Sequence, residues 1–277
     1  MTVRHTRPLG LLGGALLAAL LCLALAPVSA HAAAGGPTTP GAPPARSLEA
    51  AAKAWRAKAP ATVIVGRSVQ GRLIIAQRHG AATAPYVALV LGQMHGSEQR
   101  GRAVVAAVNG MAPPAQVQVW TISTMNPDGS AVGRRTNAHG VDLNRNWPYR
   151  WSPAYATRDF YPGKRAMTEP ETRAMLTFLN HLDPGLIVSF HQHFNAVDQG
   201  SGKALAWSQR LSKALALRLL VVPCNTGPCY GTMTQWFNAT HRGAAVTVEL
   251  PATVTTAMAR RFARGTLSVV ASLVPPA

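Results

Sequence analysis

The stretch YVALVLGQMHGSEQRG, residues 86–101, joins a predicted buried strand to a candidate metal-binding pair. Its first half is rich in Val and Leu, which is typical of a strand covered on both faces of a sheet. His95 and Glu98 follow just beyond the carboxyl end of that strand, where open α/β sheets place their ligand sites. An imidazole and a carboxylate three residues apart can bind one metal ion if the turn between them is tight or opens a helix. An isolated pair of this kind more often lies in an ordinary loop without a metal ion. Whether His95 and Glu98 bind a metal ion therefore depends on which other ligands the rest of the chain provides.

Segments with strand and helix patterns alternate along most of the chain, which predicts an α/β domain with a largely parallel sheet. Helices are expected at 98–109, 202–219 and 232–242. Three further helices are expected to begin near Ser47, at Thr168 and near Thr253. Thr168 and Glu171 have the spacing of a capping box. The expected strands are two runs within 61–80, then 86–92, 117–124, 185–190 and 244–250. The irregular stretch between residues 125 and 168 is too long for a simple connection, so we expect it to build a site.

The N-terminal 33 residues have the layout of a secretory signal peptide, with a basic start, an apolar stretch and small residues for cleavage. The alternative is a retained membrane anchor, because the apolar stretch is nearly long enough to span a bilayer. Residues 34–46 are rich in Pro, Gly and Ala and predict a flexible linker. Residues 47–277 are then expected to form one catalytic domain, in a protein exported to the periplasm or the extracellular space.

Two cysteines remain after the signal region, Cys224 and Cys229, on either side of a loop with Pro and Gly. In an oxidising compartment such a pair usually forms a disulfide. A metal site is the alternative, but two thiolates alone do not provide the ligands that zinc requires. We therefore predict that Cys224 and Cys229 are disulfide-bonded.

The formal charge of the chain is +17, with 27 basic and 10 acidic residues. A surface of this kind attracts polyanions such as nucleic acid, acidic wall polymers or anionic membranes. The basic residues are scattered, without the aromatic interleaving of a nucleic-acid module, so no nucleic-acid partner is expected. An anionic cell envelope is the expected electrostatic partner of an exported protein, and general solubility is the alternative explanation of the charge.

Three apolar strands end in residues suited to one metal site: His95 and Glu98 after the first, His191 after the second and Glu249 at the end of the third. Two imidazoles and one carboxylate make a catalytic zinc site that leaves one coordination position open. A further carboxylate at a strand end can act as the general base toward a water molecule there.

These motifs resemble those of the zinc carboxypeptidase superfamily, over roughly residues 60–272. The matching motifs occur in the family's order and are GRSVQGR (66–72), HGSE (95–98), NPDG (126–129), GVDLNRNWP (140–148), YPGKRAMTEPET (161–172), SFHQ (189–192) and TVELP (247–251). The resemblance implies a single-domain, three-layer α/β/α fold with a mixed, largely parallel twisted sheet. It also implies a zinc metallopeptidase with one zinc ion per chain, bound by His95, Glu98 and His191.

The same resemblance implies roles for the other motif residues. Glu249 is expected to be the general base that moves a proton from the attacking water to the leaving nitrogen. Asn144 and Arg145 are expected to bind the terminal carboxylate of the substrate, since a guanidinium can pair with a carboxylate through two hydrogen bonds. Arg134 is expected to polarise the scissile carbonyl and stabilise the oxyanion. Its neighbour Arg135 is the alternative for that role.

The resemblance gives less specific roles to several other histidine and aromatic residues. His193 is expected to line the substrate pocket, because alternate residues of a strand share a face. No tyrosine falls where many carboxypeptidases carry a mobile one, and Tyr230 is the nearest substitute. Residues expected to lie at the surface or at helix ends are His139, His181 and His241, and those expected to pack structurally are Trp147 and Trp236.

The family motifs do not determine which substrate the protein cleaves. The segment that selects the substrate side chain is expected at Thr232 to Gln235, which holds no acid that would select basic side chains. Compact exported bacterial members of the family resemble murein peptide amidases, which cut beside diaminopimelate. We therefore expect a monomeric exopeptidase acting on peptidoglycan-derived peptides. The alternatives are a general carboxypeptidase of ordinary peptides and, more remotely, a non-catalytic wall-peptide-binding protein.

Overall fold

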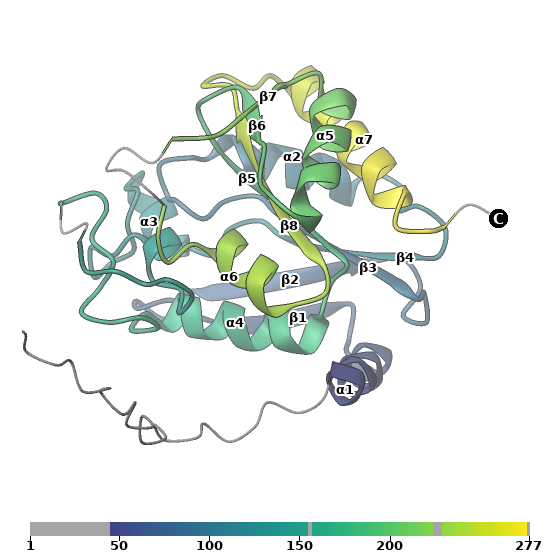
Figure 1. Cartoon of the computed structure of the whole chain (residues 1–277), viewed down its shortest axis with the longest axis horizontal. Coiled ribbons are helices and arrows are strands. Elements are labelled where there is room, and N and C mark those ends of the chain that lie inside the picture. The colour runs from purple at the N-terminus through teal and green to yellow at the C-terminus, as the bar shows by residue number, and fades with distance from the viewer. Residues whose placement is uncertain (1–44, 155–156, 224–228, 276–277) are drawn as a thin grey trace, which may run out of the picture. The chain divides into compact units, whose positions relative to one another are not determined.

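One mixed sheet in the order β1–β2–β4–β3–β5–β8–β6–β7 organises the protein (Figure 1). The structure is a computed structural model that describes residues 45–154, 157–223 and 229–275, without the side chains of 45–48. Its strands are β1 (Thr62–Arg67), β2 (Leu73–His79), β3 (Tyr86–Leu91), β4 (Val117–Ile122), β5 (Leu186–Gln192), β6 (Ala196–Asp198), β7 (Arg218–Leu220) and β8 (Ala244–Leu250). Its α-helices are α1 (Ala45–Lys58), α2 (Arg100–Asn109), α3 (Pro127–Val132), α4 (Pro170–Leu182), α5 (Lys203–Leu215), α6 (Met233–Thr240) and α7 (Thr256–Ala271).

The centre of the sheet is parallel and its margins are antiparallel. Strands β4, β3, β5 and β8 run parallel to one another, whereas β1, β2 and β4 are joined by antiparallel pairing and β6 runs antiparallel to β8. Parallel strands end at the same edge of a sheet, so the loops after β3, β5 and β8 meet there. The pairing of β5 with β8 places His191 opposite Glu249. The predicted mixed, largely parallel sheet is confirmed.

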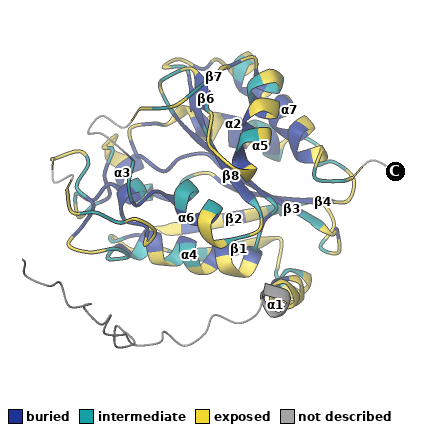
Figure 2. Cartoon of the chain, in the orientation of Figure 1, coloured by how far each residue is buried: buried dark blue, intermediate teal, exposed yellow. Residues whose placement is uncertain are grey.

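Apolar side chains fill two layers, one on each face of the sheet. One layer joins the strands to α2, α5 and α7, and the other joins them to α1, α4 and α6. The central strands are buried, while the helices keep an exposed outer face (Figure 2). Continuous apolar runs such as residues 87–91 form central strands because both of their faces are covered in this way. Among the described residues, no helix is long and apolar enough to cross a membrane.

The buried amide of Asn146 connects distant parts of the long segment between β4 and α4. Its Nδ2 donates to the carbonyl oxygens of Pro162 (2.8 Å) and Arg165 (3.1 Å) and to the hydroxyl of Thr168 (3.0 Å). Its Oδ1 accepts a hydrogen bond from the backbone N–H of Glu169 (3.2 Å). A segment with so little regular structure can be part of a packed domain because its buried polar groups find partners of this kind. It contains only α3 and the short 3-10 helix η1 (Leu143–Arg145) among its described residues.

Local expectations failed at two helix starts and at the sheet margin. Helix α1 begins at Ala45, so Ser47 lies inside it and is not its cap. Residues 45 and 46 of the predicted linker are therefore helical, and the rest of that linker lies outside the described residues. The capping box at Thr168 is also wrong, because Glu169 is the residue before α4 and Thr168 instead accepts from Asn146. Strands β6 and β7 were not predicted, since three residues are too few to show a period. The predicted signal peptide lies outside the described residues.

Candidate active site

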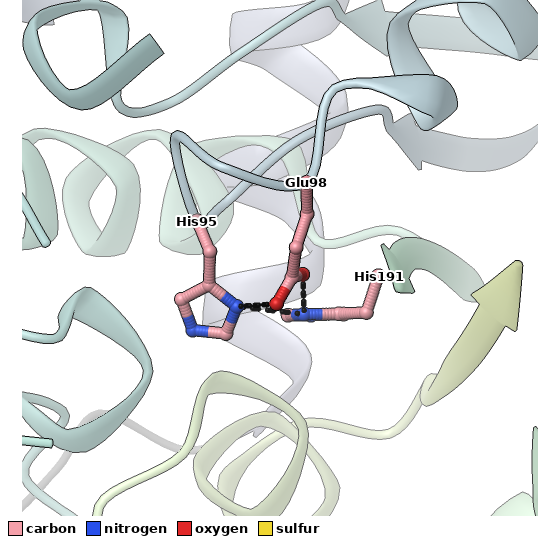
Figure 3. A group of neighbouring side chains, drawn as sticks. All are labelled: His95, Glu98 and His191. Carbon is pink, nitrogen blue, oxygen red and sulfur yellow. Dashed lines mark hydrogen bonds and ion pairs between the residues drawn. The ribbon is translucent and has the colours of Figure 1, made fainter. Parts of the chain in front are cut away.

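Three side chains from two strand ends meet in a tight cluster: His95 and Glu98 after β3, and His191 near the end of β5 (Figure 3). Nδ1 of His95 lies 2.9 Å from Oε1 of Glu98, and Nδ1 of His191 lies 3.1 Å from Oε2 of the same carboxylate. The two Nδ1 atoms are 3.2 Å apart. All three residues are buried. The predicted juxtaposition of these residues is therefore present in the structure.

A glycine lets the His95 turn pack against the loop that follows β4. A Cβ atom at Gly96 would lie 2.0 Å from the carbonyl carbon of Gly129 and 2.4 Å from the carbonyl oxygen of Arg134. Real Cβ atoms do not approach backbone this closely, so a larger residue would push the two loops apart. The Gly between the His and Glu of this motif thus positions the cluster.

The donor set fits a zinc ion. Bonds of about 2 Å in a tetrahedral zinc site place neighbouring ligand atoms roughly 3.3 Å apart. The three separations in the cluster, 2.9, 3.1 and 3.2 Å, are close to that value. Burial alone would oppose ionisation of Glu98, but the imidazoles of His95 and His191 hold its pKa far below its ordinary value. An ionised carboxylate beside two imidazole nitrogens is the arrangement that binds a divalent cation.

Asp142 contacts His95 on the side of the imidazole away from Glu98 and orients that ring. The sequence alone assigned no role to Asp142. Its Oδ1 lies 3.0 Å from Nε2 of His95 and accepts from the backbone N–H of Asn144 at 2.8 Å. Burial would raise the pKa of Asp142, but the Arg135 guanidinium and the His95 imidazole hold it well below its ordinary range. A carboxylate at Nε2 determines the tautomer of the imidazole and leaves Nδ1 as the metal-binding atom. The only sequence feature that could have indicated this role is that Asp142 is the acidic residue of the GVDLNRNWP motif.

Arg135, and not Arg134, lies at the cluster, so the structure places there the alternative candidate for the polarising arginine. Nη1 of Arg135 donates to Glu98 (3.0 Å), and its Nη2 donates to Asp142 (2.9 Å). Its guanidinium carbon lies 4.8 Å from the centre of the Phe160 ring. Arg134 is exposed and lines a separate small cavity of about 180 Å³. Neighbouring residues in an extended loop point in different directions, so the sequence could not choose between them.

Glu249 faces the cluster from the end of β8. Burial raises the pKa of its carboxyl, an effect that the nearby His191 reduces and Glu98 reinforces. Its Oε2 is buried and has no hydrogen-bond partner among the described residues. A buried carboxylate oxygen without a partner costs free energy unless a ligand or water satisfies it. Such an oxygen at the wall of a cavity is suited to accept a proton.

Asn144 and Arg145 reach the same cavity from η1. Asn144 accepts a hydrogen bond from the backbone N–H of Met233 (3.1 Å), which ties η1 to the start of α6. Nη1 of Arg145 donates to the carbonyl oxygen of Asn144 (2.8 Å), and its guanidinium carbon lies 5.9 Å from the centre of the Phe160 ring. The structure thus holds the predicted carboxylate-binding pair in place.

One cavity of about 440 Å³ joins these groups. Its lining includes the cluster, Glu249, Arg135, Asn144 and Arg145, and continues to Asp198, Thr232, Thr234 and Gln235. The predicted pocket residues of α6 therefore do line the cavity. Thr232 caps α6 by accepting from the N–H of Gln235 (3.2 Å), and Nε2 of Gln235 donates to the carbonyl oxygen of Cys229 (2.8 Å). Asp198 is an acid that the sequence analysis did not place in this cavity.

Two residues expected near the pocket lie elsewhere. His193 is exposed and is not among the residues that line the cavity, because β5 ends at Gln192 and alternation along a strand no longer applies beyond it. Its ring packs edge-on against Phe194. Tyr230 does not line the cavity either, and the guanidinium of Arg150 lies over its ring at 5.2 Å. The expectation for His193 was therefore wrong, and the structure does not support Tyr230 as a substitute for a catalytic tyrosine.

The remaining aromatic and histidine residues pack largely as expected. The rings of Trp147 and Trp236 lie 4.9 Å apart and both are buried. His181 stacks on Trp55 at the end of α4, and His139 is largely exposed and contacts Glu169. His241 lies at the end of α6 and stacks on Phe237 at 4.3 Å, which makes it more buried than a surface residue.

Comparison with known proteins identifies relatives of this arrangement. The family model described as zinc carboxypeptidase matches residues 114–197. Murein peptide amidase A of Escherichia coli (strain K12) is 32% identical over 151 residues, which cover 50% of this chain and 62% of that protein. Murein peptide amidase A of Vibrio campbellii is 32% identical over 177 residues, which cover 59% of this chain and 68% of that protein. The match thus spans somewhat less than two thirds of the first of these relatives.

A solved structure agrees with the sequence comparison. The crystal structure of murein-tripeptide amidase MpaA from Escherichia coli O157 superposes with a TM-score of 0.59 at 27% identity. The superposition covers 79% of this chain and 94% of that one. The segment that matches the family model contains Asn144, Arg145 and His191. The chain belongs to the zinc carboxypeptidase family.

Proposed function

We propose that the protein is a zinc-dependent metallocarboxypeptidase that hydrolyses an amide bond next to a free carboxylate. The observation that carries this proposal is the shared cavity: the His95–Glu98–His191 cluster, Glu249 and Arg145 all line it. A metal site, a base and a carboxylate-binding cation in one cavity are the parts that this reaction needs.

His95, Glu98 and His191 would hold the zinc ion. When bound, zinc supplies Lewis-acid chemistry, lowering the pKa of a water molecule and polarising the substrate carbonyl. Asp142 holds the imidazole of His95 so that Nδ1 faces Glu98 and His191, the other two residues that would hold the ion. Arg135 pairs with Glu98 and Asp142 and keeps both carboxylates ionised and in position.

Asn144 and Arg145 bind the free carboxylate of the substrate and thereby set the distance from the chain end to the scissile bond. A guanidinium can form two parallel hydrogen bonds to a carboxylate, which selects a chain end over an internal bond. Arg145 is held by Asn144 and by Phe160, so its guanidinium is oriented before the substrate arrives. Preorganisation of this kind lowers the cost of binding.

Glu249 moves the proton in both halves of the reaction. Its carboxylate takes a proton from the attacking water as the oxygen of that water adds to the carbonyl carbon. Arg135 stabilises the negative charge that develops on the former carbonyl oxygen. Glu249 then gives the proton to the amide nitrogen, the carbon–nitrogen bond breaks, and a carboxylic acid and an amine are released. One water is consumed for each bond cut.

Peptidoglycan-derived peptides are the proposed substrates, with the protein acting as a murein peptide amidase. The support is that two relatives at 32% identity and a solved structure at 27% identity are named for murein peptides. The polar lining at Thr232, Thr234 and Gln235 also favours a polar side chain over an apolar one, since the buried Oε1 of Gln235 has no hydrogen-bond partner among the described residues. Trimming of ordinary peptide C-termini is the competing function.

Export and a disulfide belong to the same proposal. We propose that residues 1–33 direct export and that the basic protein, at +17, associates with the anionic cell envelope. We also propose a Cys224–Cys229 disulfide. Cys229 is disulfide-bonded in the structure, which supports this pairing. Cys224 lies outside the described residues.

The test offers the purified protein a murein tripeptide and blocked dipeptides with aliphatic or aromatic C-termini, with products identified by mass spectrometry. Zinc content is measured on the same protein. Glu249→Gln should retain zinc and lose turnover by several orders of magnitude, because the ligands stay and the base is gone. Cleavage of the ordinary dipeptides alone would reject the murein substrate, and a protein that neither binds zinc nor cuts either class would reject the enzyme.

A further inference from the structure

Asp198 is the acidic residue of the cavity that the proposed mechanism does not use. It ends β6, which pairs with β8 so that Ala196 lies opposite Glu249. Asp198 lines the cavity of about 440 Å³ that holds the His–Glu–His cluster. It also lines a second cavity of about 530 Å³. A residue in the wall of both cavities can contact any ligand that passes from one to the other.

The two cavities are neighbours. The residues that line both are Asp198, Gly200, Ser201, Thr234, Gln235 and Thr247. A substrate residue bound through its carboxylate by Arg145 can therefore extend its side chain past Asp198 and into the second cavity. Arg150 and Lys203 lie in the wall of that cavity.

No cation neutralises Asp198 among the described residues. Its carboxylate accepts the backbone N–H of Val222 at 3.0 Å and further backbone N–H groups from Gly200 and Gln199. It takes part in none of the ion pairs of the described chain, although the protein has 27 basic residues. Burial raises the pKa of Asp198, so a cation bound beside it would be stabilising.

We propose that Asp198 is a specificity-determining residue that binds an ammonium group at the far end of the substrate's C-terminal side chain. This inference rests on the proposed function and names the side chain that the site selects. The segment Thr232 to Gln235 holds no acid, as expected from the sequence, and Asp198 supplies one from a different part of the chain. Lysine and diaminopimelate both carry such an ammonium group. Diaminopimelate adds a carboxylate beside it, for which Arg150 and Lys203 are the available cations of the second cavity.

The experiment uses three tripeptides that differ only in the C-terminal residue: diaminopimelate, lysine and norleucine, which lacks the ammonium group. Values of kcat/KM are measured for the wild type and for Asp198→Asn. A hydrogen bond to a charged group contributes about 1.5–3 kcal/mol, so the substitution should lower kcat/KM for the ammonium substrates by about 10-fold to 100-fold. Cleavage of the norleucine peptide should be unchanged.

Asp183→Asn is the matched control. Asp183 is also an acid whose pKa burial raises, but it lies at the end of α4 in a left-handed conformation that asparagine adopts readily, and it lines neither cavity. This variant should cut all three peptides like the wild type. An equal loss on all three peptides in Asp198→Asn would show a structural role and overturn the inference, and so would no loss on any of them.

A binding measurement separates this inference from the proposed function. Calorimetric titration with free diaminopimelate, lysine and norleucine needs no turnover. Ammonium-dependent binding that is lost in Asp198→Asn supports the inference even if the wild type cuts none of the peptides, in which case the proposed function fails. Equal binding by the wild type and Asp198→Asn overturns the inference and leaves the proposed function intact.

Discussion

Oδ1 of Asp142 lies 3.0 Å from Nε2 of His95, on the side of the imidazole away from Glu98. Both side chains are buried. A proposed metal ligand is therefore held by a second carboxylate that does not itself belong to the His–Glu–His cluster. This relationship links the conformation of the loop before η1 to the geometry of the metal site.

Asp142→Asn should weaken zinc binding while leaving the three proposed ligands in place. Loss of a carboxylate behind a ligating histidine typically lowers metal affinity or activity by about 10-fold to 100-fold. The affinity can be measured by competition with a chromophoric chelator. Asp128→Asn is a control of the same chemistry, because Asp128 is also buried and hydrogen-bonded, but to Ser68 and Arg72 away from the cluster. Equal zinc affinity in Asp142→Asn and the wild type would contradict the orienting role.

Arg135→Gln should lower kcat/KM far more than Arg134→Gln. Removal of one group that stabilises an oxyanion typically costs about 100-fold to 1,000-fold in kcat. Arg134 is exposed and lines a different cavity, so its substitution should have little effect. Steady-state kinetics on one murein tripeptide check both variants. The reverse order of effects would restore Arg134 as the polarising arginine.

His241 should make the protein less stable in mild acid. Burial, reinforced by the charge of Lys203, lowers the pKa of His241 from 6.5 to about 4 in the folded protein. Between these two values the unfolded chain binds the proton and the folded protein does not, so stability is full above pH 6.5 and falls as the pH approaches 4.

Urea unfolding between pH 7 and pH 4 tests this assignment. Replacement of His241 by Gln should make the free energy of unfolding fall less steeply with decreasing pH. Identical slopes in the wild type and His241→Gln would show that His241 is not the titrating group.

Cys224 and Cys229 should resist thiol labelling in the exported protein until a reductant is added. Mass spectrometry after alkylation of the unfolded chain counts the free thiols. The carbonyl oxygen of Cys229 accepts from Gln235, which lines the cavity, so the Cys224→Ser/Cys229→Ser double variant should reduce activity more than stability. Closing so short a loop removes little unfolded-chain entropy, roughly 2–3 kcal/mol at most. Two alkylated thiols without reductant would rule the disulfide out.

Much of the site could be predicted because its residues follow long apolar strands. Runs such as residues 86–91 and 186–190 carry a strong strand pattern, and parallel strands end at a common edge. His95, Glu98, His191 and Glu249 meet for that reason. The family motifs added the roles of Asn144 and Arg145, which the structure places in the same cavity.

The rest depended on how the loops and the short strands fold against the sheet. Arg134 and Arg135 are neighbours in sequence, and only the path of the chain after α3 decides which one reaches Glu98. Asp198 ends a three-residue strand whose pairing with β8 brings it to the cavity wall. Local sequence carries the period of a strand or helix, whereas the direction of a loop side chain and the pairing of a short strand come from contacts between distant segments. By itself the sequence therefore determined the sheet and the His–Glu–His cluster, and only the tertiary structure placed Arg135 and Asp198 in the wall of the cavity.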